Sequence, residues 1–177
     1  MIRSSLIIVI AILGTAEAAE TPTSDPFDLS SISRQAEELG VPTKSEVDSL
    51  ESRAGVLFES GDCQAALPAL EDLAKKSNFL ANLVFAGIQP YYGASYDYRK
   101  NYSGSSKQSL VEYERLANQY KNKRNRATVM QGECFAKLGD IVMAAIYLSK
   151  ALDFIDIHDG YWWKRARKQL YGLLEVE

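Results

Sequence analysis

The chain contains 177 residues, a length that suits a single domain, with 46% hydrophobic and 24% charged residues. This mixture is ordinary for a folded protein and excludes a chain that is disordered throughout, since disorder requires low hydrophobicity and a high net charge. A net charge of −3 argues against a dedicated nucleic-acid binder, and one histidine with two cysteines supplies too few side chains for a zinc site of those ligands.

Residues 1–18 have the pattern of a secretory signal peptide. Arg3 precedes an unbroken apolar run at residues 6–13, and Ala16-Glu17-Ala18 has the small-x-small pattern of a cleavage site. The run is far shorter than the ~20 apolar residues of a membrane-spanning helix, which disfavours the alternative of an uncleaved anchor. We therefore expect cleavage after Ala18, export to the periplasm or the extracellular space, and no transmembrane segment in the mature chain.

Residues 19–43 are expected to form a flexible tether. Their first half contains Pro22 and Pro26 among Ser, Thr and acidic residues, with little hydrophobic periodicity. A short helix is predicted within the tether from Ile32 to Leu39, because Gly40 and then a proline follow as stop signals.

Residues 44–177 are expected to form one helical domain that begins with a hairpin. The run from Ser45 to Asp48 resembles a capping box at the start of a helix. Gly61 breaks that helix, and Asp62 is a suitable N-cap for the next one. Apolar residues recur in both helices at spacings of three and four: Leu50, Ala54, Leu57 and Phe58, then Ala66, Leu70 and Leu73.

A second hairpin repeats this pattern around Gly139-Asp140. Alignment of the two Gly-Asp turns places Gly132 opposite Ala54 and Ala144 opposite Ala66. Small residues at these positions let two helices approach closely, while larger apolar residues fill the space beside them. Such a hairpin cannot bury its apolar face alone and must stack on neighbouring elements.

Residues 132–152 of this second hairpin resemble a tetratricopeptide repeat. The resemblance covers residues 44–156 and implies an all-α fold, a short right-handed solenoid of about three helical hairpins. The two Gly-Asp turns lie 78 residues apart, which equals two repeats of about 34 residues plus ten. A middle repeat is therefore expected from helices at residues 79–88 and 106–121, with an insertion at residues 89–105. The main rival is an irregular α-helical bundle.

A terminal helix is predicted from Tyr161 to Leu174. It resembles the helix that caps such arrays, because one side is apolar and the other is basic. The apolar side would cover the last repeat, while the basic side would remain in water; these two sets are Trp162, Ala166, Leu170 and Leu173, and Lys164, Arg165, Arg167 and Lys168.

Cys63 and Cys134 are separated by 70 residues and fall in different predicted repeats. Export would permit a disulfide between them. Since unpaired cysteine is commonly buried as a small hydrophobic residue, the sequence favours two buried thiols, with the disulfide as the alternative.

Charge is distributed unevenly along the chain. Residues 20–72 contain 12 acidic and 3 basic residues, whereas residues 73–177 contain 16 basic and 10 acidic residues. An elongated solenoid would hold these charges at opposite ends, which favours two partner surfaces or head-to-tail self-association, with solvated helix faces as the alternative. The densest basic run, residues 121–126, is interpreted as a solvated turn between repeats, or else as a site for an anionic ligand or acidic peptide.

Five of the ten tyrosines lie in the insertion at residues 89–105: Tyr91, Tyr92, Tyr96, Tyr98 and Tyr102. Tyrosine suits recognition surfaces because it combines a large apolar ring with a hydroxyl group. The alternative is that the rings pack over the repeats. We expect packing for Tyr91 and Tyr92, and exposure for Tyr96 and Tyr98.

The resemblance implies a non-enzymatic module that binds a protein or peptide segment in a groove lined by the first helix of each repeat. No catalytic, cofactor or metal site is recognised, and no nucleic-acid partner is expected. The groove residues that the resemblance implies are Asp48, Glu51 and Phe58 from the first repeat, and Arg126, Val129, Glu133 and Lys137 from the third. The alternative is an exported enzyme or small-ligand binder that uses the tyrosine-rich insertion, with Tyr96 and Tyr98 as contact residues.

Overall fold

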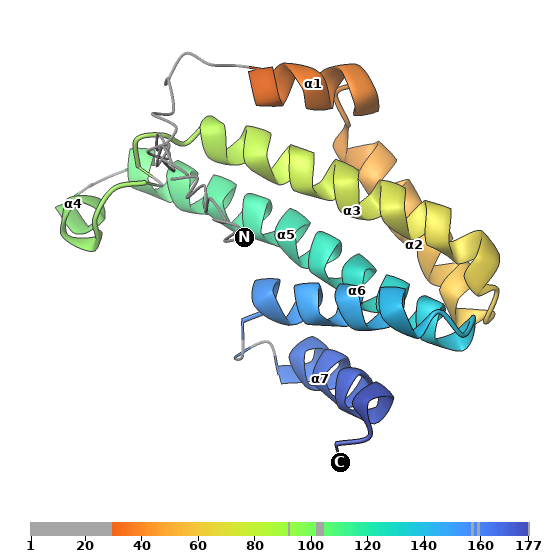
Figure 1. Cartoon of the computed structure of the whole chain (residues 1–177). Coiled ribbons are helices and arrows are strands. Elements are labelled where there is room, and N and C mark those ends of the chain that lie inside the picture. Colours follow the sequence, from red (N-terminus) through yellow and green to blue (C-terminus); the bar gives the residue numbers. More distant parts are fainter. Residues whose placement is uncertain (1–29, 92, 102–104, 157, 159, 177) are drawn as a thin grey trace, which may run out of the picture.

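A computed structural model describes residues 30–91, 93–101, 105–156, 158 and 160–176. Within these residues the structure contains helices and no strands, which confirms the predicted all-α class (Figure 1). The helices are α1 Ser30–Leu39, α2 Lys44–Glu59, α3 Cys63–Ala86, α4 Tyr96–Asn101, α5 Ser105–Lys137, α6 Ile141–Phe154 and α7 Gly160–Leu174. The predicted signal peptide and residues 19–29 of the predicted tether lie outside the described residues, and the short helix predicted from Ile32 to Leu39 is part of α1. None of the described helices is both long enough and apolar enough to cross a membrane.

The helices stack on a long central pair. α3 and α5 run side by side, α2 packs against α3, α6 packs against α5, and α7 follows on α6 (Figure 1). The main core lies between α2, α3 and α5 and contains Val47, Leu70 and Tyr120, while a second cluster under α7 contains Leu148 and Ala166. The short α4 lies where α3 ends and α5 begins, at the end of this pair that is opposite the α2–α3 turn (Figure 1).

The two Gly-Asp turns have the same geometry, as their alignment predicts. Gly61 and Gly139 adopt φ angles of +81° and +82°, a region in which glycine has no steric penalty. The carboxylates of Asp62 and Asp140 each accept a hydrogen bond at 3.0 Å from a backbone N–H three residues later. Asp62 and Asp140 are therefore the N-caps of α3 and α6.

The N-cap of α2 lies earlier than the sequence pattern indicates. Thr43 has an extended backbone, and its hydroxyl accepts a hydrogen bond from the N–H of Glu46. The helix begins at Lys44, so the predicted capping box at Ser45 is wrong. Thr43 follows Pro42, and a hydroxyl residue in extended conformation directly before a helix satisfies one of its free N–H groups.

The predicted boundaries of the middle repeat are also wrong. The helix expected at residues 79–88 is the last part of α3, and the helix expected at residues 106–121 is the first part of α5. The basic run at residues 121–126 is consequently helical rather than a turn. Neither junction contains the glycine or proline that would end a helix, so each helix continues and the two form one long antiparallel pair.

The insertion between α3 and α5 holds its tyrosines as predicted where the structure describes them. Tyr91 is 5% exposed, whereas Tyr96 and Tyr98 on α4 are 72% and 50% exposed. Arg99 anchors α4, because its guanidinium lies over the Tyr91 ring and pairs with Glu114 of α5 at 3.1 Å. Tyr92 and Tyr102 lie outside the described residues.

Cys63 and Cys134 form a disulfide, with a Cα–Cα distance of 5.0 Å. The prediction of two free thiols is therefore wrong. Because α3 and α5 are antiparallel, the first residue of α3 lies beside the last turn of α5. Two cysteines that the sequence places in different repeats thus meet at one end of the central pair.

The predicted terminal helix is confirmed as α7. Ala166 is fully buried, and Trp162, Leu170 and Leu173 pack against the cluster that includes Leu148. Lys164, Arg167 and Lys168 are exposed as expected, but Arg165 is only partly exposed and turns toward α5.

α5 and α6 approach each other closely at Gly132 of α5. A Cβ atom at this position would lie 2.7 Å from the Cγ atom of Leu148, which is fully buried. Gly132→Ala should therefore lower the free energy of unfolding by ~1–3 kcal/mol, because the core must shift to admit the methyl group. Gly55→Ala in α2 is the control: no atom lies within 4 Å of its Cβ position, so this variant should gain about 0.5–1 kcal/mol. Urea midpoints for both variants test this, and equal midpoints would contradict the α5–α6 packing.

The disulfide closes a sequence separation of 71 residues. Loss of a native cross-link in a small domain lowers stability by ~2–5 kcal/mol. A Cys63→Ala/Cys134→Ala variant should therefore unfold at a lower denaturant concentration than the oxidised protein. A reducing agent should destabilise the natural sequence and leave the variant unchanged; a variant as stable as the oxidised protein would argue against the cross-link.

Candidate functional site

The two predicted acidic groove residues of α2 form ion pairs with a lysine of the same chain. Lys123 of α5 binds Asp48 at 2.5 Å and Glu51 at 2.6 Å. Hydrogen bonds from Lys123 and Lys44 hold the pKa of Asp48 below its usual value. The two acids therefore attach α2 to α5, and their charges are already matched by a cation of the same chain.

Three further groove predictions fall on buried residues. Phe58 and Val129 are 8% and 0% exposed, and Glu133 is 5% exposed. The Glu133 carboxylate accepts hydrogen bonds of 2.5 and 2.7 Å from Arg165 of α7. This charge-assisted pair raises the pKa of Arg165, against the opposing effect of its burial.

Arg126 and Lys137 are the exposed members of the predicted groove. The Lys137 ammonium lies 5.3 Å from the centre of the Phe58 ring, and the Arg165 guanidinium lies 5.6 Å from it. Arg126 lies 6.0 Å from the Trp162 ring. The predicted groove residues of α5 and Phe58 thus lie near α7. Most of their contacts are packing contacts and ion pairs within the chain.

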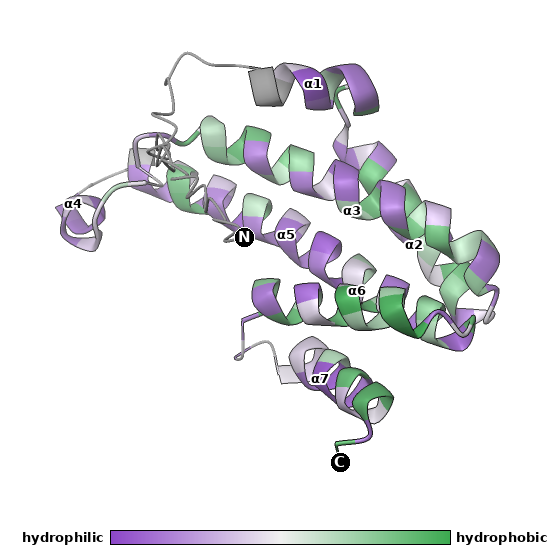
Figure 2. Cartoon of the chain, in the orientation of Figure 1, coloured by the Kyte–Doolittle hydropathy of each residue, from purple (hydrophilic) through white to green (hydrophobic). Residues whose placement is uncertain are grey.

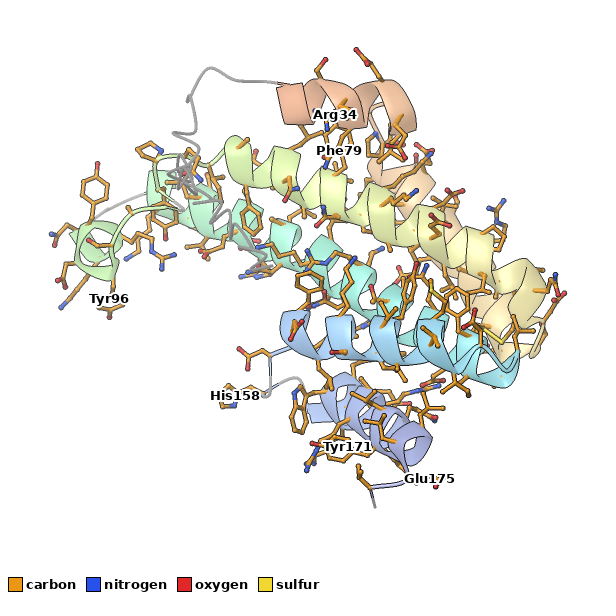
Figure 3. All side chains as sticks on the ribbon, in the orientation of Figure 1. Arg34, Phe79, Tyr96, His158, Tyr171 and Glu175 are labelled. Carbon is orange, nitrogen blue, oxygen red and sulfur yellow. A yellow bond between two sulfur atoms is a disulfide. The ribbon has the colours of Figure 1, made fainter. Side chains whose placement is uncertain are left out.

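The other predicted contact residues lie far from this group. Tyr96 lies on α4 at the left edge of the molecule, whereas α7 lies below α6 (Figure 3). Tyr98 lines an open hollow of about 470 Å³ that also includes Pro90 and Ser95. The insertion therefore forms a surface of its own.

The basic residues at 121–126 contact different parts of the chain, although Lys121, Arg124 and Arg126 also line one open hollow together with Asp156 and His158. Lys121 lies over the Phe85 ring at 3.9 Å, Lys123 binds the acids of α2, and Arg126 points to Trp162. Only Arg124 enters a cleft between α3, α5 and α6. This cleft has a volume of about 240 Å³ and is lined by Glu71, Ala74, Lys75, Asn78, Arg124, Thr128, Gln131, Tyr147, Lys150 and Phe154.

Arg124 is held in the cleft by neutral groups. Its Nη1 donates to the Asn78 side-chain oxygen at 2.8 Å, and its Nε and Nη2 donate to the Asn125 side-chain oxygen at 3.0 and 2.9 Å. The guanidinium lies 4.4 Å from the centre of the Phe154 ring, and Asn125 is fixed in turn by donating to the Phe154 carbonyl at 3.1 Å. Burial lowers the pKa of Arg124, although an arginine retains its proton at neutral pH.

The charge of Arg124 has no acidic partner in the part of the chain that the structure describes. Within those same residues, Lys150 of α6 forms no ion pair either, and it is exposed on the rim of the cleft. Glu71 also lines the cleft, but it binds Lys75 at 3.0 Å. The cleft therefore carries two unmatched positive charges.

An exposed apolar surface adjoins the cleft. Leu138, Ile141, Val142 and Ile146 are each about half exposed or more, at 50%, 49%, 70% and 53%; we call these four residues the α6 aliphatic face. The middle of α6 is among the most hydrophobic parts of the ribbon in Figure 2. Because Val142, Ile146 and Lys150 follow at intervals of four residues, they form one row along the helix that leads to the cleft rim.

Sequence reasoning identified the basic run but not the cleft. Arg124 and Thr128 are four residues apart, so they lie on the same side of a helix. This relation could be recognised only if residues 121–126 were assigned to a helix. The α6 aliphatic face had a clearer signal, since Ile141, Val142 and Ile146 exceed what one buried helical stripe needs.

The pair between Glu133 and Arg165 generates a stability prediction. Arg165→Met should lower the free energy of unfolding by ~3 kcal/mol, because it leaves the Glu133 carboxylate buried without a cation. A Glu133→Gln/Arg165→Met variant should recover most of that loss, since no buried charge remains. Arg167→Met on the exposed side of α7 is the control, with an expected change below ~1 kcal/mol. Chemical denaturation of the three variants decides this, and equal losses for the single and double variants would contradict it.

No group of three or more His, Cys, Asp or Glu side chains in the described residues is placed to hold a metal ion. Comparisons of the chain with protein-family models, with curated proteins and with solved structures found no match. The chemistry of the cleft and of the α6 aliphatic face therefore carries the functional conclusion.

Proposed function

We propose that this chain is a non-enzymatic binding module, built from tetratricopeptide-like helical hairpins, that docks a segment of a partner protein. The proposal is supported by the two equivalent hairpin turns at Gly61 and Gly139 and by the close helix contact at Gly132. These features agree with the resemblance of residues 132–152 to a tetratricopeptide repeat, and modules of that kind use stacked helices as interaction surfaces.

The observation that carries the proposal is the α6 aliphatic face beside the cleft. Exposed apolar residues scattered singly are normal, but a contiguous group indicates a surface that another molecule covers. Here the group continues into a cleft with two unmatched positive charges. A protein segment with aliphatic and acidic side chains complements both parts, because one end of such a surface is apolar and the other is cationic.

The predicted groove is a weaker docking surface for this segment. Asp48, Glu51 and Glu133 are bound to cations of the same chain, so a partner would have to displace these pairs before it could use the acids. The α6 aliphatic face requires no such exchange. We therefore assign the partner segment to the face formed by α6 and the cleft.

Export is part of the proposal. It rests on the signal-peptide pattern of residues 1–18, and the disulfide between Cys63 and Cys134 agrees with it, because disulfides persist mainly in oxidising compartments. The partner would accordingly be another exported protein.

Site-specific photo-cross-linking in the native cells tests the docking surface. A photo-reactive phenylalanine analogue at Ile146 should form one product of defined mass, whereas the same analogue at Val56, an exposed residue of α2, should form none. Ile146→Asp in a protein with the analogue at Val142 should reduce that product by at least about tenfold, since a charge in an apolar contact disfavours binding.

Two further positions separate the competing surfaces. A product at Lys137 without one at Ile146 would favour the predicted groove instead. A small-molecule adduct or a product only at Tyr98 would favour the alternative function, in which the tyrosine-rich insertion binds the ligand.

A further inference from the structure

We infer that the cleft between α3, α5 and α6 is a carboxylate-binding site, in which Arg124 and Lys150 receive an Asp or Glu side chain of the docked segment. This inference rests on the proposed function and assigns the chemistry of its polar half. It makes the acidic residue the specificity element of the segment, next to aliphatic residues that contact Val142 and Ile146.

The donors of Arg124 outnumber the acceptors around it. A guanidinium has five N–H groups, and the described residues accept three hydrogen bonds from Arg124: one at Asn78 and two at Asn125. Two N–H groups, one on Nη1 and one on Nη2, have no acceptor among the described residues. A carboxylate suits them because it accepts two hydrogen bonds in the plane of a guanidinium.

The guanidinium is also preorganised. Asn78 and Asn125 fix it from two sides, and the Phe154 ring covers one of its faces at 4.4 Å. A side chain that is already ordered loses little conformational entropy when a ligand binds. This arrangement distinguishes Arg124 from exposed arginines such as Arg115, which is 61% exposed and binds Glu112 on the same helix.

The remaining groups of the cleft favour a ligand of the size of one acidic side chain. Lys150 adds a second unmatched charge at the rim, and Gln131, a residue that is 4% exposed, also lines the cleft. Gln131 can donate to a carboxylate oxygen or accept from a protonated group. The volume of about 240 Å³ admits one side chain rather than a folded surface.

A carboxylate is favoured over a more highly charged anion by Glu71. This acid lines the same cleft, and although Lys75 neutralises it, its oxygens repel a phosphate dianion more strongly than a single carboxylate. The aliphatic face beside the rim adds a contact that a free inorganic ion does not use. The source of the carboxylate is therefore a protein segment rather than a dissolved ion.

The test uses the whole exported chain and a tripeptide probe, acetyl-Leu-Glu-Leu-amide, followed through the Arg124 Nε–H resonance in an NMR titration. The glutamyl peptide should shift this resonance in a saturable manner, while acetyl-Leu-Gln-Leu-amide should bind at least about tenfold more weakly, since it cannot form the charge-assisted pair. Glutarate and inorganic phosphate are the comparison arms. Equal or tighter binding of either would overturn the assignment to a protein segment.

Variants show whether the cleft is the site. In each variant, binding of the peptide is measured from the chemical shifts of the α6 backbone amides. Arg124→Gln should weaken the glutamyl peptide about tenfold or more, and Lys150→Ala about two- to fivefold, as expected for an exposed charge. Lys150→Ala keeps the fold intact because Lys150 is exposed, and Arg115→Gln is the matched control that should change nothing. Unchanged affinity in both Arg124→Gln and Lys150→Ala would overturn the inference.

The two proposals fail in different ways. A cross-link at Ile146 that persists in Arg124→Gln, together with no preference for the glutamyl peptide, overturns the carboxylate site and leaves the docking function standing. Glutamyl-peptide binding that depends on Arg124, with no cross-linked protein at Ile146, supports the site and overturns protein docking as its use.

Discussion

The antiparallel contact between α3 and α5 is the interaction on which the other helices depend. Ala66, Leu70 and Leu73 of α3 lie in the same core as Tyr120, Ala127 and Cys134 of α5, and the disulfide joins the two helices at one end. Each remaining helix uses this pair as its support: α2 is attached through Lys123, and α6 through the close contact at Gly132. Burial of apolar surface between long helices is the main stabilising contribution in such an arrangement.

This central pair also changes the meaning of the uneven charge distribution. The acidic first part and the basic second part of the chain do not simply lie at two ends. Lys76 binds Glu46, Lys75 binds Glu38, and Lys123 binds Asp48 and Glu51. Acidic residues of the first part of the chain therefore form ion pairs with basic residues of the second part. Such partly exposed pairs add little stability individually, but they occupy acids that a partner would otherwise contact.

Arg124 is held differently from Lys123 and Arg126 on the same helix. Lys123 binds the acids of α2 and Arg126 lies near the Trp162 ring, whereas Arg124 donates to the amides of Asn78 and Asn125 and lies over the Phe154 ring. A charge that is partly removed from water and not matched has a higher free energy than one that is paired. The binding of an acidic group would lower that free energy. The α6 aliphatic face would select ligands in which the acid is flanked by apolar side chains.

The sequence by itself determined the helical class, both Gly-Asp turns, the terminal helix and the contrast between Tyr91 and Tyr98. These features depend on local signals, namely glycine at positive φ, an aspartate N-cap and apolar spacing of three and four, which act over a few residues. Only the tertiary structure decided the disulfide and the different contacts of Lys123, Arg124 and Arg126. Those outcomes depend on which helix faces meet, and a rotation of one residue along a helix, about 100°, moves a side chain from one neighbouring helix to another.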